Sequence, residues 1–143
     1  MELLIEVNIY DTSGKERFDA IVSTYYKKAD CCLLVYDITN KQSFEKIKNF
    51  YVNELKEKAE SIYNIILLGN KTDLENQRVV SQEEGLALSK ANNFVFMETS
   101  CVSNYNVSSA FETLIEMTNT EMKKKNCQRL KTKSNIKKNG GCC

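Results

Sequence analysis

The sequence predicts an α/β fold built on a parallel β-sheet, because short apolar runs alternate along the chain with segments of helical periodicity. Four runs are predicted strands, over residues 3–10, 31–36, 65–68 and 94–97. The last three are continuously apolar, which is typical of strands buried on both faces of a parallel sheet. The first alternates only in part, and we expect it to be the first strand of this chain.

Three further segments carry apolar residues at helical spacing. In residues 43–58 these form one stripe, made of Phe44, Ile47, Tyr51 and Leu55. Ser81 and Glu84 have the spacing of a capping box, which predicts a helix from there through residue 88. Asn106 is the expected N-cap of a last helix, whose apolar face comprises Val107, Ala110, Phe111, Leu114 and Ile115.

Charge divides the 143-residue chain into an acidic body and a basic tail, although its formal net charge is only +1. Residues 1–122 hold 12 of the 20 cationic residues and all 19 carboxylates, a net charge of −7, and the last 21 residues carry +8. We expect one folded domain over residues 1–122 and a disordered tail over residues 123–143, where the apolar pattern stops. Basic tails attract anionic membrane surfaces or nucleic acid.

Cysteine usage and hydropathy exclude several classes of protein. The six cysteines form no Cys-x-x-Cys pair and the chain has no histidine, so the spacing does not suit a zinc site. No basic region precedes the first apolar run, as a signal peptide would require, and no run approaches the ~18 residues of a membrane helix. The expected setting is therefore reducing and cytosolic, with free thiols.

The most informative motif is Asn70-Lys71-x-Asp73, which directly follows the apolar run 65–68 and Gly69. Loops at the carboxyl ends of parallel strands are where α/β sheets bind ligands. The Asp73 carboxylate can accept two hydrogen bonds from the N1–H and N2 amine of guanine, a donor pair that adenine lacks. The methylene stem of Lys71 can cover the face of a flat base. The competing interpretation is a polar turn.

Two weaker motifs also follow predicted strands. Asp11 and Gly14 lie after the first run, where a carboxylate can hold Mg²⁺ through water and a glycine lets a backbone N–H approach a phosphate. Thr99-Ser100-Cys101 follows the last run, where a backbone N–H could reach a base carbonyl. Taken singly, each motif is better explained as an ordinary turn or loop.

Together, the three motifs in this order resemble the small GTPases, and several stretches resemble the Rab family in particular. These stretches are Asp11-Thr12-x-Gly14-x-Glu16-Arg17-Phe18, Tyr25-Tyr26, Val35-Tyr36-Asp37 with Ser43-Phe44, Gly69-Asn70-Lys71-x-Asp73-Leu74, Glu98-Thr99-Ser100 and the final Cys142-Cys143. The resemblance covers residues 3–122 and the tail. It implies a Ras-like sheet of the P-loop NTPase type that lacks, in this chain, its first strand, phosphate loop and first helix.

The resemblance also implies functions for individual residues. The position of Asp11 serves Mg²⁺ through water, and that of Gly14 senses the γ-phosphate. Asn70, Lys71 and Asp73 would hold guanine. Ser100 and the Cys101 N–H would complete the base pocket. The implied cofactors are GTP or GDP and Mg²⁺, and the implied activity is GTP hydrolysis.

The family function implied is guanine-nucleotide switching in vesicle-mediated protein transport. It is exercised on the cytoplasmic face of an intracellular membrane, in exchange with the cytosol. The implied partners are Rab effectors and regulators, the Rab escort and prenylation machinery and the membrane surface, and not nucleic acid. In Rab proteins a Cys-Cys ending resembles a double geranylgeranylation signal, which makes Cys142 and Cys143 the expected lipid acceptors. Two lipid chains, or one with a basic patch, anchor a protein stably. The competing interpretation is a solvated charge run with idle thiols.

The sequence departs from the family pattern at three places, of which Val102, where many small GTPases carry lysine, is minor. The phosphate-binding Gly-x-x-x-x-Gly-Lys-Ser/Thr is absent: the only Gly-Lys pair is Gly14-Lys15, and five positions before Gly14 stands Ile9. Lys15 also occupies the position where the family usually has glutamine, which orients the attacking water, as in Ras. An ammonium group has no acceptor, so we expect Lys15 to impair this catalytic position.

Three interpretations of the chain therefore stay open. It is a part of a complete nucleotide switch, or a truncated, non-catalytic and prenylated protein that binds Rab partners without nucleotide, or a product without function. For the chain in isolation we expect a tendency to aggregate or partial loss of fixed packing, because a strand missing between residues 3–10 and 31–36 would leave unpaired edges. Direct pairing of those two runs would relieve this.

Overall fold

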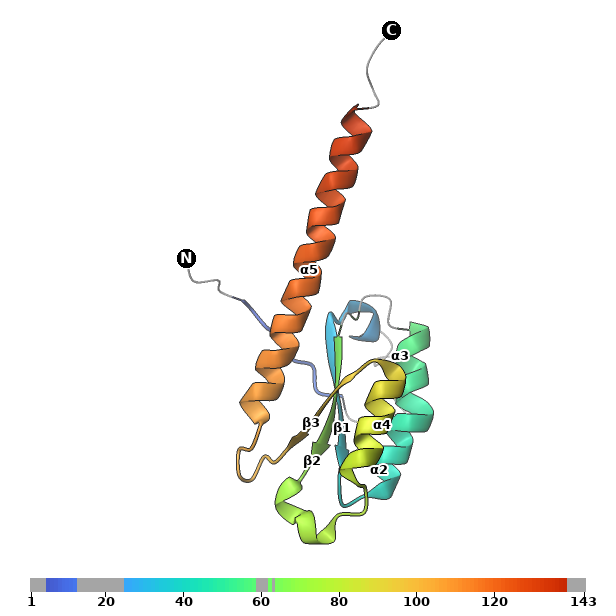
Figure 1. Ribbon diagram of the computed structural model, residues 1–143, viewed down its shortest axis with the longest axis vertical. Coiled ribbons are helices and arrows are strands. Elements are labelled where there is room, and N and C mark those ends of the chain that lie inside the picture. The colour runs from blue at the N-terminus through green and yellow to red at the C-terminus, as the bar shows by residue number, and fades with distance from the viewer. Residues whose placement is uncertain (1–4, 13–24, 59–61, 63, 139–143) are drawn as a thin grey trace.

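A three-stranded parallel sheet forms the centre of the molecule (Figure 1). The computed structural model describes residues 5–12, 25–58, 62 and 64–138. The strands are β1 (Cys31–Asp37), β2 (Asn64–Asn70) and β3 (Val95–Thr99), in the order β1-β2-β3. Asp37 is aligned with Asn70, and Asn70 with Thr99, so all three strands end at the same level.

Helices cover both faces of this sheet (Figure 1). On one side lie α2 (Lys41–Lys46), the π-helical turn η2 (Ile47–Tyr51), α3 (Val52–Lys58) and α4 (Gln82–Asn92). On the other side, α5 (Val107–Lys138) packs against β1 and β2. A short 3₁₀ segment, η3 (Thr72–Gln77), follows β2. This arrangement confirms the predicted α/β class and the three strands expected from the continuous apolar runs.

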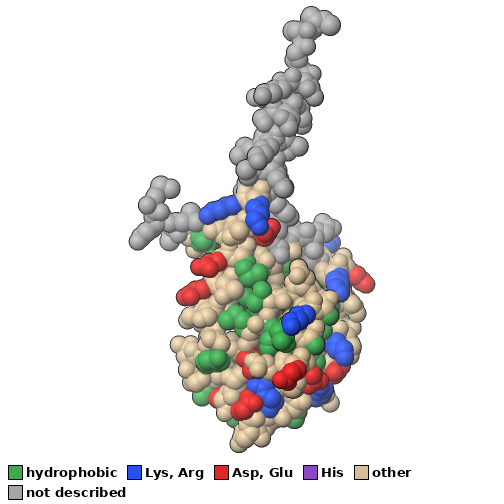
Figure 2. All heavy atoms as spheres, viewed as in Figure 1, with side chains coloured by type: hydrophobic (Ala, Val, Ile, Leu, Met, Phe, Trp, Pro, Cys, Tyr) green, Lys and Arg blue, Asp and Glu red, His purple; other side chains and the backbone are tan. Residues whose placement is uncertain are grey.

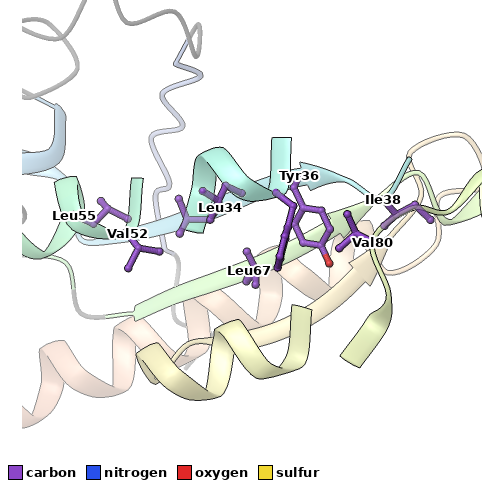
Figure 3. Packing of buried hydrophobic residues seen from close by; sticks show 9 residues of the cluster. Leu34, Tyr36, Ile38, Val52, Leu55, Leu67 and Val80 are labelled. Carbon is purple, nitrogen blue, oxygen red and sulfur yellow. The ribbon is translucent and has the colours of Figure 1, made fainter. Parts of the chain in front are cut away.

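The core consists of two apolar clusters separated by the sheet. The larger cluster lies between the sheet and the α2–α4 side and comprises Leu34, Tyr36, Ile38, Phe44, Ile47, Val52, Leu55, Leu67 and Val80 (Figure 3). The smaller one, under α5, comprises Ile66, Leu68, Ala110 and Leu114. Successive residues of β2 thus enter opposite clusters, which is why this strand is apolar throughout. Each fully buried side chain of this kind contributes about 1.5–3 kcal/mol.

Of the two predicted helix caps, the structure forms the capping box in full and the Asn106 cap through its backbone carbonyl. The capping box is present: the Ser81 hydroxyl accepts from the Glu84 N–H at 3.2 Å, and the Ser81 N–H donates to the Glu84 carboxylate at 3.0 Å. Asn106 directly precedes α5, and its carbonyl accepts from the Ala110 N–H at 3.0 Å. Its side-chain amide, however, donates to the Glu98 carbonyl at 3.0 Å.

The strand expected over residues 3–10 is wrong for the part of it that the structure describes. Residues 5–12 form no strand, and the direct pairing with residues 31–36 that we considered is not made by them. Their apolar side chains stay exposed, at 43% for Ile5, 44% for Val7 and 69% for Ile9. Without a buried face to cover, the weak alternation of this segment does not fix a register.

The C-terminal segment also differs from its expected disorder, because α5 continues across residue 122 as far as Lys138. No glycine or proline interrupts residues 107–138, and lysine, arginine, leucine and glutamine are good helix formers. The second half of α5 projects beyond the sheet (Figure 1). In the described ranges, no helix is both long and apolar enough to cross a bilayer.

Candidate functional site

The candidate site lies where β2 and β3 end. Because Asn70 and Thr99 are aligned in neighbouring parallel strands, the loops that follow them start side by side. One loop carries Lys71 and Asp73, and the other carries Ser100 and Cys101. The structure therefore brings together all five site residues that the sequence predicted on these two loops. This is the edge of the sheet at which α/β folds bind ligands.

The side chain of Asp73 is held in a fixed orientation by Ser100. The Ser100 hydroxyl donates a hydrogen bond of 2.6 Å to Asp73 Oδ1, and the same hydroxyl accepts from the Ser103 N–H at 3.2 Å. Ser100 is fully buried, with 0% of its surface exposed. Hydrogen bonds to an ionised group are among the stronger ones in proteins. Asp73 is thereby oriented in advance, with Oδ2 left to accept from a ligand.

Asn70 and Thr99 join the two loops more closely. The Thr99 hydroxyl donates to Asn70 Oδ1 at 3.3 Å, and the Thr72 hydroxyl donates to the Thr99 carbonyl at 3.2 Å. The Cys101 thiol lies 3.8 Å from the same Asn70 oxygen and is exposed. Asn70 therefore organises the site through its side-chain oxygen, while Cys101 lies at its open rim.

Lys71 has a left-handed backbone, with φ 71° and ψ 38°, at the start of η3. Its ammonium nitrogen lies 2.6 Å from Asp37 Oδ2, at the end of β1. The other oxygen of Asp37 accepts from the N–H and the hydroxyl of Thr39, at 2.8 and 2.7 Å. Partial burial alone would raise the pKa of Asp37, but the bonds from Lys71 and Thr39 outweigh it and lower that pKa. The bond to Asp37 raises the pKa of Lys71.

Arg78 ties the η3 segment to β3. Its guanidinium contacts both oxygens of Glu98, at 2.7 and 3.1 Å, and both oxygens of Glu75, at 2.8 and 2.6 Å. It also donates to the Val80 carbonyl at 3.1 Å. The hydrogen bonds that Arg78 donates to Glu75 and Glu98 raise the pKa of Arg78 further above its ordinary value. Glu75 lies two residues after Asp73, and Glu98 two residues before Ser100, so this bridge supports the loops of the site.

Sequence reasoning did not assign a role to Arg78 or to Asp37 in the site. A signal for Asp37 existed, because the carboxyl ends of neighbouring parallel strands lie at the same edge. The residue that follows the run 31–36 therefore had to lie near Asn70. Arg78 offered no comparable signal, since η3 is an irregular segment whose path does not follow from apolar periodicity.

Of the other predicted site residues, the structure describes only Asp11. Asp11 is exposed in residues 5–12. Among the residues that the structure describes, no three His, Cys, Asp or Glu side chains group as possible metal ligands. Gly14, Lys15, Cys142 and Cys143 lie outside the described residues.

The geometry favours a ligand with adjacent donors on one edge and a flat face. A carboxylate fixed through one oxygen can accept from two neighbouring N–H groups, as guanine presents at N1 and N2. Adenine has no such pair and would leave Oδ2 of the carboxylate without a partner, which is costly for a charged group. The site could thus discriminate between purines by the hydrogen bonds of their edges.

Comparisons with known proteins give matches along most of the chain. A family model described as "Ras family" matches residues 2–120. The rice protein "Ras-related protein RGP2" is 45% identical over 78% of this chain and 51% of its own length. "Ras-related protein RABA5a" of Arabidopsis thaliana is 38% identical over 97% of this chain and 71% of its own length. Chicken "Ras-related protein Rab-8A" is 43% identical over 85% of this chain and 58% of its own length. The chain spans about half the length of several of the curated relatives it matches.

Proposed function

Because the chain belongs to the Ras family and, within it, to the Rab-related small GTPases, we propose that it carries the base-recognition part of a guanine-nucleotide switch. The observation that supports this proposal most strongly is the Asp73 carboxylate, oriented by the buried Ser100 at the ends of two parallel strands. A relative in fission yeast, ypt3, is described as a GTP-binding protein.

Each residue of the site has a distinct role in this proposal. Asp73 accepts from N1–H and the N2 amine of guanine. The Cys101 N–H donates to the base carbonyl oxygen, and Ser100 keeps Asp73 in place. Lys71 covers the face of the base with its methylene stem. Asn70 holds the two loops in register through its contacts with Thr99 and Cys101.

Phosphate and Mg²⁺ recognition belongs to the proposed activity of the whole protein, which would alternate between GTP and GDP forms. Gly14 would serve the γ-phosphate, Asp11 would hold Mg²⁺ through water, and Lys15 would occupy the impaired water-orienting position. These 143 residues contain no Gly-x-x-x-x-Gly-Lys-Ser/Thr. In the family that loop supplies most phosphate contacts. For this chain we therefore expect GTP to bind little better than guanosine, no tighter than micromolar, with or without Mg²⁺.

Nucleoside binding to the purified chain tests the proposal. Titration of the ¹⁵N-labelled protein with guanosine, inosine and adenosine, followed by amide chemical shifts, should give the order guanosine, then inosine, then adenosine. Inosine keeps N1–H but lacks the N2 amine, so it should lose about tenfold, the equivalent of one charge-assisted hydrogen bond. Equal affinities for the three nucleosides, or no shifts at residues 70–73 and 99–101, would contradict base recognition by this site.

We further propose that the protein acts in vesicle traffic at the cytoplasmic face of an intracellular membrane, anchored by lipids on Cys142 and Cys143. The net charge of +8 in the last 21 residues supports attraction to anionic lipid. Its partners there would be the escort and prenylation machinery and the Rab effectors and regulators. In a eukaryotic cell, the Cys142→Ser, Cys143→Ser double variant should leave the membrane fraction. An equal distribution of the variant and the parent would reject the anchor.

A further inference from the structure

Hydrogen bonds from Thr39 hold the carboxylate of Asp37 in place, in addition to its ion pair with Lys71. The N–H and hydroxyl of Thr39 both donate to Oδ1, and the Asp37 N–H donates to the Ser43 hydroxyl at 3.0 Å. Asp37 is the last residue of β1 and is aligned with Asn70, the residue before Lys71. Only Oδ2 faces the ammonium of Lys71, at 2.6 Å.

Lys71 is constrained from both ends. Its backbone is left-handed, a conformation that is uncommon for residues other than glycine, and its carbonyl accepts from the Leu74 N–H at 2.9 Å. Its ammonium is held by Asp37. A lysine on a surface loop normally samples many rotamers, and this one is restricted at both the backbone and the charged end.

We propose that Asp37 is a positioning residue for base binding, which orders the Lys71 side chain before a purine arrives. The inference rests on the proposed function, since it is the Lys71 stem that would cover the base. Binding costs less when a rotamer-rich side chain is already immobilised. Asp37 thus acts through Lys71 and makes no contact with the base, whereas Asp73 selects the base by its edge.

The affinity of guanosine for Asp37→Asn tests this role. The substitution keeps an acceptor for Thr39 but removes the charge that holds Lys71. Guanosine affinity should fall roughly three- to tenfold, the effect of one side chain that must be ordered on binding. The ratio of guanosine to inosine affinity should stay unchanged, because the stem contacts the face that the two bases share. The Tm should change little, since an ion pair with an ammonium this exposed contributes little to stability.

Two further variants separate positioning from a general effect. In the Lys71→Met background, Asp37→Asn should cause no additional loss, because no ammonium remains to be held. Asp30→Asn removes an exposed carboxylate before β1, at its opposite end, and should bind guanosine like the parent. Wild-type affinity in Asp37→Asn, a changed guanosine-to-inosine ratio, or an equal loss in the Lys71→Met background would overturn the inference. If the parent chain does not bind guanosine at all, it is the proposed function that fails, and the inference fails with it.

Discussion

The Tyr36 hydroxyl lies close to two glycines, Gly69 and Gly85. The residue is 1% exposed, and within the part of the chain that the structure describes its hydroxyl has no hydrogen-bond partner. A Cβ atom at Gly69 would lie 2.9 Å from this oxygen, and one at Gly85 would lie 2.6 Å from it. Burial, and then the nearby charge of Glu98, raise the pKa of Tyr36 to about 12. Burial of this hydroxyl group therefore lowers the free energy of unfolding.

Tyr36→Phe should leave the free energy of unfolding unchanged or raise it by about 1 kcal/mol, because it removes a buried polar group that lacks a partner. The advantage should grow at high pH. The unfolded tyrosine ionises near pH 10, below its folded value of about 12, so ionisation favours the unfolded state from pH 10 upward. Urea unfolding of both proteins at pH 7 and pH 10.5 measures this. A loss above 1 kcal/mol at pH 7 would mean that the hydroxyl has a partner.

Gly85→Ala should have the opposite outcome to that expected from helix propensity. In an exposed helix this change would stabilise by about 1 kcal/mol. Here the new Cβ would lie 2.6 Å from both Tyr36 Oη, in the buried core, and Cε2 of Phe96, a partly buried side chain packed against that core. Overpacking of this kind costs about 1–3 kcal/mol, so we expect net destabilisation in urea. A rise in stability would show that the ring of Phe96 yields without cost.

At the scale of elements, Arg78 connects η3 with β3 through directed hydrogen bonds, which depend on geometry more than apolar contacts do. Its side chain is 15% exposed and that of Glu98 is 12% exposed, whereas that of Glu75 is 65% exposed. Arg78→Lys keeps the charge but loses the fork of parallel donors. We expect a loss of about 1–3 kcal/mol in urea, because the Glu98 carboxylate loses hydrogen bonds in a mostly buried position.

The two carboxylates that Arg78 contacts provide an internal comparison. Glu98→Gln should destabilise the fold clearly more than Glu75→Gln, since the exposed member of an ion pair contributes little. Equal effects of the two substitutions, or full stability of Arg78→Lys, would contradict this view of the bridge.

The elements that sequence could predict are those whose apolar pattern is unambiguous. Side chains of β2 belong to an apolar cluster on each face of the sheet, and the continuous apolar run of this strand predicted that. The capping box of α4 was likewise predictable, because two side chains at fixed spacing suffice to form it. Residues 5–10 were not, since a partly alternating pattern does not say whether a partner strand is present. The helical extension of α5 beyond residue 122 was not predicted, because the apolar pattern of the sequence stops there.

In the candidate site, the residues on the two loops followed from motif and strand position. The hydrogen bond from Ser100 to Asp73 did not, because the two residues are 27 positions apart and the bond depends on the register of β2 and β3. Asp37 could have been placed at this edge from its position directly after the run 31–36, whereas the irregular η3 segment before Arg78 gives no such signal. Pairing across the sheet is a property of the folded chain, which local patterns do not encode.

At the scale of the whole molecule, β1 is an edge strand that has the composition of a central one. Among the described residues it pairs only with β2. Val35, in the middle of β1, is 51% exposed. On the face that Figure 2 shows, hydrophobic side chains are exposed between α5 and α4 among charged side chains of both signs, on the β3 side of the sheet and away from β1. Long apolar edges promote association between copies of a chain, so self-association through β1 is expected.

Val35→Lys should therefore raise the monomeric fraction at concentrations where the parent chain associates, since lysine blocks edge-to-edge pairing. Val79→Lys is the matched control, because Val79 is 52% exposed but lies in the loop between η3 and α4. Sedimentation velocity over a concentration series compares the three proteins. An equal effect of the two substitutions would assign the change to net charge, and the role of the β1 edge would be rejected.

The base preference of the Asp73→Asn variant tests the central claim most directly. Xanthine has a carbonyl oxygen where guanine has the N2 amine, so a carboxylate suits guanine and an amide suits xanthine. In Asp73→Asn the Ser100 hydroxyl can still donate to Oδ1, which keeps the side chain in its orientation. Titrations of both proteins with guanosine and xanthosine should show the parent preferring guanosine and Asp73→Asn preferring xanthosine. An unchanged order of affinities in the variant would contradict recognition of the base by this carboxylate.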